Sequence, residues 1–164
     1  MPVYAIDKLI SETRRLAVEF RRSTGQPLPV SGEIARYDAA RFLNLTLCEP
    51  RNNGVDAVGN GDQDGLRFQI KVRVLSDDNR PGVRIGQINP NGEWDKLLLV
   101  IMDHEYEACE IYEVDKELAL EVITIGGDSH RVRRGAMSVA KFKNIGLLTW
   151  TRETGVAGDA WTNY

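Results

Sequence analysis

The stretch DAVGNGDQDGLRFQIKVRVL, residues 56–75, contains two β-type runs on either side of a turn rich in Gly and Asp. This pattern predicts strands over residues 55–59 and 66–75, joined as an antiparallel pair through the turn NGDQDG. With the turn centred near residue 62, Asp56 is expected close to Phe68 or Gln69 on the partner strand. The hairpin is the element that the sequence defines best, and the other elements are placed around it.

The second strand of this hairpin is expected to have two different faces. Its apolar residues point to one side, and Gln69 and Lys71 point to the other, because successive side chains alternate along a strand. A lysine is costly to bury without a partner, so Lys71 faces either water or a site that requires a cation. Asp56, Gln69 and Lys71 can therefore converge. Such a set suits Mg²⁺ beside a phosphate, because this ion prefers oxygen ligands and keeps several waters.

Two other interpretations of the hairpin need no such site. An ordinary hairpin with a solvated polar face is the simplest one. The turn NGDQDG also matches the first half of an EF-hand calcium loop, but the loop's bidentate glutamate position would fall on Lys71. The flanking segments moreover predict strands and not helices. We therefore interpret NGDQDG as an acidic, solvated turn.

The remaining segments predict one α/β (α+β) domain over residues 1–164, with a central mixed β-sheet flanked by helices. Apolar periodicity predicts helices over residues 3–22, 32–45 and 115–123. EPRNNG, residues 49–54, is expected to be a loop. Further strands are predicted over 83–88, 96–103 and 106–114. The last dozen residues, about 153–164, predict a surface tail.

The composition is typical of a globular protein, with 42% hydrophobic and 27% charged residues. A formal net charge of −3 neither indicates nor excludes nucleic-acid binding, because local patches decide it. The sequence contains no apolar run of membrane-spanning length and no secretory signal, and Cys48 and Cys109 have no metal-site spacing. We therefore expect a cytoplasmic protein with no membrane partner.

GVDAV followed by RFQIKVR resembles the core of the PD-(D/E)XK nuclease superfamily. That core has an acid at the start of one strand and acid-x-Lys on the next, and a helical glutamate often precedes both. Here GEIARYDAARFLNL supplies Glu33. The series resembles a group of uncharacterised bacterial domains of this superfamily and covers the core motifs over residues 31–75. The resemblance implies a restriction endonuclease-like core and an Mg²⁺- or Mn²⁺-dependent endonuclease that hydrolyses DNA phosphodiester bonds.

The resemblance also implies a role for each matching residue. Asp56 would be the main metal ligand, and Gln69 a second ligand with the Ile70 backbone carbonyl nearby. Lys71 would position the hydrolytic water or help to deprotonate it, and Glu33 would hold a metal-bound water or a second ion. Gln69 stands where the superfamily usually has an acid. A neutral ligand there should lower the metal affinity, because the site keeps fewer negative charges.

Cationic side chains that could contact phosphate come from two places. Arg73 continues the face of Gln69 and Lys71, and a basic run over residues 129–144 supplies Arg131, Arg133, Arg134, Lys141 and Lys143. Solvated surface positions are the alternative for all of them. For Glu33 the alternative is a solvated helix residue paired with Arg36 at i+3.

The sequence thus supports two functions of different classes. The first is the DNA endonuclease, for which a homodimer is attractive because two single-cut sites would cut both strands of a duplex. The second is a catalytically inactive module of the same fold that binds nucleic acid or a protein partner. Lys71 favours the first, since a site that no longer cuts has no need of a partly buried lysine there.

Overall fold

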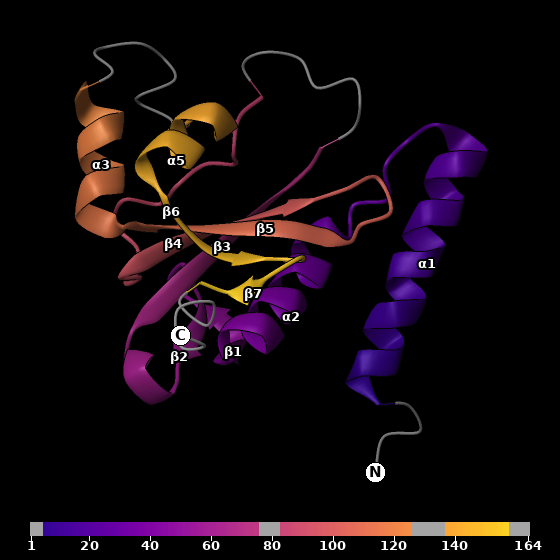
Figure 1. Ribbon diagram of the computed structural model, residues 1–164, viewed down its shortest axis with the longest axis horizontal. Helices are drawn as coiled ribbons and strands as arrows, with labels where there is room; N and C mark the ends of the chain where they lie inside the picture. Colours follow the sequence, from indigo (N-terminus) through magenta and orange to yellow (C-terminus); the bar gives the residue numbers. More distant parts are fainter. Residues whose placement is uncertain (1–4, 76–82, 126–136, 158–164) are drawn as a thin grey trace.

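A seven-stranded mixed sheet forms the centre of the computed structural model, which describes residues 5–75, 83–125 and 137–157 (Figure 1). The strand order follows the chain, and all neighbouring strands are antiparallel except β3 and β4, which are parallel. The strands are β1 (Leu45–Asn52), β2 (Val55–Gly59), β3 (Arg67–Val74), β4 (Lys96–Met102), β5 (Ala108–Asp115), β6 (Leu147–Thr151) and β7 (Gly155–Val156). The predicted mixed α/β architecture is confirmed.

Four α-helices lie within the described residues: α1 (Ile6–Thr24), α2 (Ser31–Leu43), α3 (Lys116–Ile125) and α5 (Val139–Ile145). A short 3₁₀ turn, η1 (Gly61–Gln63), separates β2 from β3. The three helices predicted from apolar periodicity are confirmed as α1, α2 and α3, with ends shifted by a few residues. α2 ends at Asn44, which has a positive φ of 57° and so closes the helix in the left-handed region.

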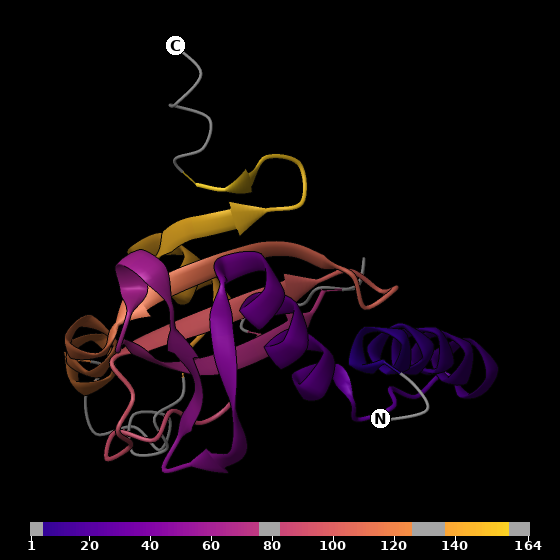
Figure 2. The same ribbon diagram turned by 90° about the horizontal axis from the view of Figure 1, so that it is seen from below.

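The two faces of the sheet bury separate clusters of apolar side chains. On one face Phe68 and Leu98 pack with Ile34 and Ala39 of α2. On the other face Leu97 packs with α3, with α5 and with the segment from 83 to 94. Helices therefore cover both faces, as Figures 1 and 2 show. This explains why β4 is a continuous apolar run, since a strand covered on both sides has no polar face.

α1 stands to one side of the sheet (Figures 1 and 2). Arg14 holds it in place, because its Nη2 donates to both carboxylate oxygens of Asp38 on α2, at 2.7 and 2.6 Å. The Nε of Arg14 also donates to the backbone carbonyl of Tyr106, at 3.0 Å. Asp38 is buried, and this burial raises the pKa of its carboxyl group although Arg14 opposes the shift. One buried ion pair thus fixes α1 on α2.

Two predictions around the hairpin are wrong. Leu45, the last residue of the predicted second helix, and residues 49–52 of the expected loop instead belong to β1, which lies at the edge of the sheet, whereas residues 53–54 form a turn. An edge strand tolerates Pro50, which has no backbone N–H to donate. The predicted strand 83–88 contributes only the isolated bridge between Arg84 and Ser138. Since β3 and β4 pair directly with each other, the sheet has no place for a strand between them. Ile85 and Ile88 pack into the apolar cluster instead.

The segment predicted as a surface tail begins with a short strand. Val156 of β7 pairs with Trp150 of β6, and Gly155 pairs with Thr151. Residues 158–164 of that segment lie outside the described residues.

Candidate functional site

The candidate site lies at the point where β2 separates from β3. The ladder pairs Ala57 with Phe68, so Asp56 lies opposite Gln69, as the sequence predicted. One residue further along β3, the backbone N–H of Ile70 donates to Asp56 Oδ2 at 2.7 Å. The carboxylate of Asp56 therefore takes the place of a backbone acceptor. This contact fixes the carboxylate in the fork between the two strands.

Two arginines also engage Asp56, which is only 6% exposed. Its Oδ1 lies 3.2 Å from Arg36 Nε and 3.0 Å from Arg51 Nε. The same two guanidinium groups contact Glu33, where Arg36 Nη1 donates to Oε2 at 2.9 Å and Arg51 Nη2 donates to Oε1 at 2.7 Å. Two arginines thus join the two carboxylates that the sequence analysis selected.

The two arginines differ in their freedom to move. Arg36 has a side chain that is 5% exposed, and its Nη2 also donates to the backbone carbonyl of Cys48 at 3.1 Å. Arg51 is 51% exposed, and its contacts within the described residues are with Glu33 and Asp56 alone. Arg36 is therefore part of the buried structure, whereas Arg51 can leave Asp56 without opening the fold.

Gln69 brings an unsatisfied polar atom to this fork. The residue is 7% exposed, and its Oε1 has no hydrogen-bond partner among the described residues. Its Nε2 lies near Gly54, at the turn that joins β1 to β2, since a Cβ added to Gly54 would lie 3.4 Å from it. Most buried polar atoms in folded proteins have a partner. A carbonyl oxygen left without one, next to Asp56, is a position where a ligand would be favoured.

Lys71 is half-buried and does not project into open solvent. A Cβ added to Gly86 would lie 3.8 Å from its Nζ, so the segment that contains Gly86 lies over the lysine. The structure gives Nζ no hydrogen bond or ion pair with any described residue. Burial lowers the pKa of Lys71, the charge of Asp56 opposes that shift, and Arg73 and Arg51 add to it. Lys71 is thus a partly desolvated cation under the influence of Asp56.

The other residues that were predicted to contact phosphate lie in different surroundings. Arg73 donates to the backbone carbonyls of Arg84 and Val72, and burial lowers its pKa. Lys143 lies 3.3 Å from Glu110 Oε1, whereas Lys141 is exposed on α5. Arg131, Arg133 and Arg134 lie outside the described residues. For all of these residues, the phosphate contact stays a prediction.

The fork between β2 and β3 offers few oxygen ligands to a divalent cation. In the described part of the chain, no group of three or more His, Cys, Asp and Glu side chains could hold a metal ion. The fork offers one carboxylate, the free Oε1 of Gln69 and the nearby carbonyl of Ile70. Mg²⁺ often takes one or two protein ligands and completes its shell with water and substrate phosphate. The residues therefore fit a weakly held ion, once Arg51 has left Asp56.

Arg51 and Arg36 both contact Asp56, and the sequence indicated neither of them as a site residue. Arg51 is the one for which a local signal existed. It belongs to the segment that was predicted as a loop. Asn53 and Gly54 both have positive φ, 50° and 82°, as the two central residues of a tight hairpin turn require. Asn52 pairs with Val55, and the register then shifts along β1 up to Leu47. Arg51 lies directly before that pair, and its Nε reaches Asp56 Oδ1 at 3.0 Å. The Asn-Gly pair was the signal that could have placed Arg51 here.

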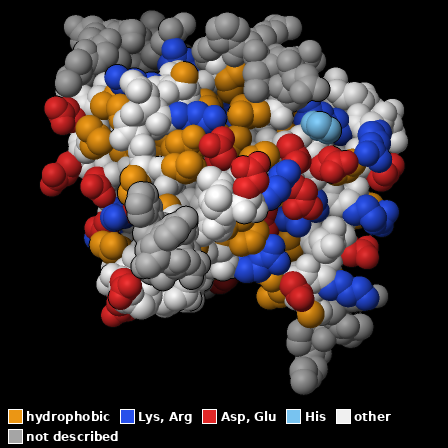
Figure 3. Space-filling model, in the orientation of Figure 1, with side chains coloured by type: hydrophobic (Ala, Val, Ile, Leu, Met, Phe, Trp, Pro, Cys, Tyr) orange, Lys and Arg blue, Asp and Glu red, His pale blue; other side chains and the backbone are white. Residues whose placement is uncertain are grey.

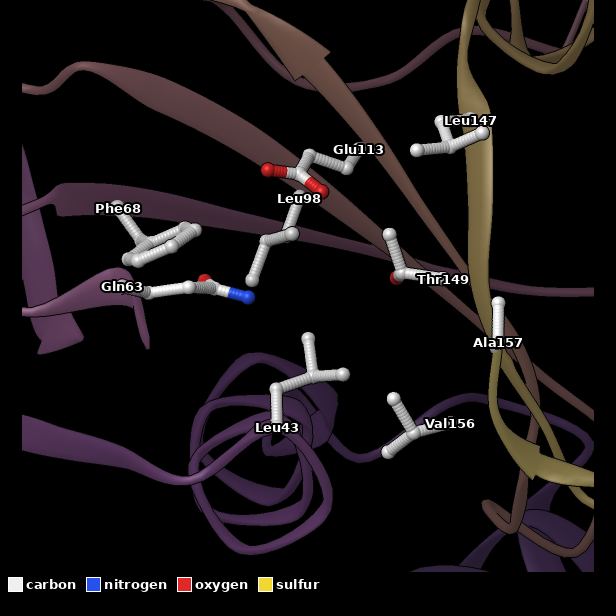
Figure 4. A pocket seen from close by; sticks show the side chains of 9 residues that line it. All are labelled: Leu43, Gln63, Phe68, Leu98, Glu113, Leu147, Thr149, Val156 and Ala157. Atoms are coloured by element: carbon white, nitrogen blue, oxygen red, sulfur yellow. The ribbon is translucent and has the colours of Figure 1, made fainter. Parts of the chain in front are cut away.

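A hollow lies on the face of the sheet that packs against α2 (Figure 4). It has a volume of about 190 Å³ and lies against Phe68 and Leu98, with the side chains of Glu113 and Gln63 turned into it. The carboxylate of Glu113 already forms an ion pair with Lys96 Nζ at 2.5 Å. Its charge is balanced, so this hollow offers less to a ligand than the fork at Asp56.

The outer surface does not point to one partner. Figure 3 shows acidic and basic side chains interspersed over the visible face, among the residues that are described. None of the described helices combines the length and the apolar character needed to cross a membrane. No protein-family model matches the chain, and no curated protein matches it either. The fork between β2 and β3 is therefore the feature of the described structure from which a function can be proposed.

Proposed function

We propose that the protein is an Mg²⁺-dependent endonuclease that hydrolyses DNA phosphodiester bonds at the fork between β2 and β3. The observation that carries this proposal is a pair of polar groups near Asp56 that have no hydrogen-bond or ion-pair partner among the described residues: Gln69 Oε1 and the ammonium group of Lys71. A buried acceptor and a partly desolvated cation are both costly unless a ligand uses them. A metal ion with a phosphate beside it would satisfy both at once.

The proposed roles follow from these positions. Asp56 and the Gln69 carbonyl oxygen would hold Mg²⁺ or Mn²⁺, which supplies Lewis-acid stabilisation of the phosphate when bound. Lys71 would orient the attacking water, and its positive charge would stabilise the negative charge that develops on the phosphate. The water oxygen would bond to phosphorus as the bond to the 3′ oxygen breaks, which leaves a 5′ phosphate. That product is what the superfamily resemblance implies.

Glu33 has a different role in this proposal from the one that the resemblance implies. Its side chain is 61% exposed and contacts Arg36 and Arg51. It would therefore act through these arginines, as a positioning residue, and not as a ligand of the first ion.

One observation favours the second candidate function, a module that binds nucleic acid or a protein partner without cutting. Both arginines occupy Oδ1 of Asp56, the oxygen that a metal ion would need. Around the fork, the described residues include four cations (Arg36, Arg51, Lys71 and Arg73) and three carboxylates (Asp56, Glu33 and Glu49), the last of which lies 3.8 Å from Arg36 Nη2. Such a balance suits a phosphate group even without a metal ion.

Cleavage assays separate the two functions. The purified protein would be incubated with duplex, branched and single-stranded DNA in the presence of Mg²⁺ or Mn²⁺. We expect cleavage by the wild type and none by Lys71→Met or Asp56→Asn. The exposed positions Lys8→Met and Asp64→Asn are matched controls that should cut normally. Binding without cleavage on all three substrates would favour the module.

A homodimer remains part of the proposal, and α1 offers a surface for it. Its exposed apolar residues Ile6, Leu9, Leu16 and Phe20 recur at the a and d spacing of a coiled coil. On the adjoining flank, Glu12 pairs with Arg15 and Glu19 pairs with Arg22. Because both signs alternate there, a second copy of the same helix would meet complementary charges. We therefore propose a second copy of this chain as the partner of α1.

A further inference from the structure

Arg51 holds the position on Asp56 that a divalent cation would require. Its Nε lies 3.0 Å from Asp56 Oδ1, and its Nη2 lies 2.7 Å from Glu33 Oε1. The other Asp56 oxygen accepts from the Ile70 N–H, which belongs to the strand and cannot leave. An ion that reaches Asp56 therefore meets Arg51 as its direct competitor.

The surroundings of Arg51 allow it to be displaced. It is 51% exposed, whereas Arg36 on the same oxygen is 5% exposed and also bound to a backbone carbonyl. If Arg51 leaves, Asp56 keeps the hydrogen bond from the Ile70 N–H and the ion pair with Arg36, whose Nε lies 3.2 Å from Oδ1 without forming a hydrogen bond. The fold therefore does not depend on Arg51, and its contact with Asp56 is the weaker kind of ion pair, formed by a partly exposed side chain.

The released guanidinium group would find a new partner at the same site. Arginine offers planar, paired donors that match the two free oxygens of a phosphodiester. Lys71, which has no direct partner among the described residues, lies under the influence of the same carboxylate. A phosphate drawn to Lys71 would thus be within the neighbourhood of the freed Arg51.

We propose that Arg51 is a resident counter-ion that couples the two ligands of this site: it leaves Asp56 when a divalent cation binds and then contacts the phosphodiester. This inference rests on the proposed metal-dependent function. Because coupling between two ligands is reciprocal, DNA should strengthen the binding of the ion as much as the ion strengthens the binding of DNA. Arg51 acts here as a positioning residue, since it controls access to Asp56.

Calorimetric titration with Mn²⁺ tests the coupling without any need for catalysis. We define binding to the site as the part of the Mn²⁺ binding that is lost in Asp56→Asn. This definition separates it from adventitious binding of Mn²⁺ elsewhere on the surface. We expect Arg51→Ala to bind Mn²⁺ about fivefold more tightly than the wild type. Arg51→Lys should lie between them. Arg152→Ala is the matched control, because Arg152 is 49% exposed and lies 2.7 Å from Asp103, a different carboxylate.

A second titration adds a short duplex DNA in the Lys71→Met background, which the proposal expects not to cut. DNA should tighten Mn²⁺ binding when Arg51 is present and should have a smaller effect in Arg51→Ala. Equal Mn²⁺ affinity with and without Arg51 would overturn the inference and leave the metal site standing. Absence of Asp56-dependent binding in the wild type and in Arg51→Ala would overturn both the inference and the metal-dependent function. Thermal unfolding confirms that each variant is folded.

Discussion

We expect the position of Lys71 to reduce the stability of the fold. Its ammonium group is half-buried without a direct partner among the described residues, and burial lowers its pKa. We expect Lys71→Met, which keeps the chain length and removes the charge, to stabilise the fold by about 1 kcal/mol while it abolishes cleavage. Urea unfolding at neutral pH measures the gain. A loss of stability in Lys71→Met would show that the lysine is structural.

The difference in stability between Lys71→Met and the wild type should become smaller as the pH rises. The unfolded chain holds the Lys71 proton up to the usual pKa of 10.5, and the folded protein loses it at a lower pH. As pH rises from the lowered pKa to 10.5, the cost of burying the charge disappears. The stability advantage of Lys71→Met should therefore be full at neutral pH and shrink through this window. An advantage that stays constant up to pH 10.5 would mean that the charge is not its cause.

Some contacts of Asp56 could be predicted from the sequence, and others could not. Alternation along the strand and the centre of the turn placed Asp56 opposite Gln69, because both are local properties of one hairpin. The Asn-Gly turn could have placed Arg51 beside Asp56, but the joint contact of Arg36 and Arg51 with one oxygen could not be placed in the same way. Arg36 comes from a helix and Arg51 from another hairpin, so their meeting at one oxygen depends on tertiary packing.

Among the elements, α1 is held by few polar contacts, which makes its anchor easy to test. Arg14→Met would leave Asp38 as a buried carboxylate without its main partner. Removing one partner of a buried ion pair is strongly destabilising, so we expect a loss of about 3 kcal/mol. Chemical denaturation provides the measurement, and Arg15→Met, on an exposed pair with Glu12, is the control. A loss no larger than that of the control would contradict the anchoring role of Arg14.

The exposed stripe of α1 leads to a second prediction for this element. Introducing charge at a and d positions disrupts a helix pair, so the double variant Leu9→Glu, Leu16→Glu should be monomeric where the wild type is dimeric. Leu147→Glu is a control at an exposed leucine on β6. Analytical ultracentrifugation distinguishes the two states. A wild-type protein that is monomeric at high micromolar concentration would remove α1 as a dimer surface.

Elements with strong local patterns were predicted well, and those that depend on the rest of the sheet were not. β1 contains Pro50 and ends at Asn52, directly before the Asn53-Gly54 turn, so its composition indicated a loop, although an edge position accepts such a strand. Residues 83–88 have the composition of a strand. They do not join the sheet between β3 and β4, because these two strands pair directly with each other. A local pattern cannot show which edges of a sheet are already paired.

At the scale of the whole molecule, net charge and local charge differ. The chain carries a formal charge of −3, yet cations outnumber carboxylates around the fork. Binding to a polyanion would therefore depend on this local excess, and it should weaken steeply as salt concentration rises.

We propose above that Asp56 and Lys71 form a catalytic site for phosphodiester hydrolysis. The most direct test is Mg²⁺-dependent cleavage of DNA by the wild type beside Lys71→Met and Asp56→Asn, each shown to be folded. We expect cleavage by the wild type that chelation of the metal stops, and none by either variant. Equal cleavage by all three proteins, or no cleavage by the wild type on duplex, branched or single-stranded DNA, would contradict this proposal.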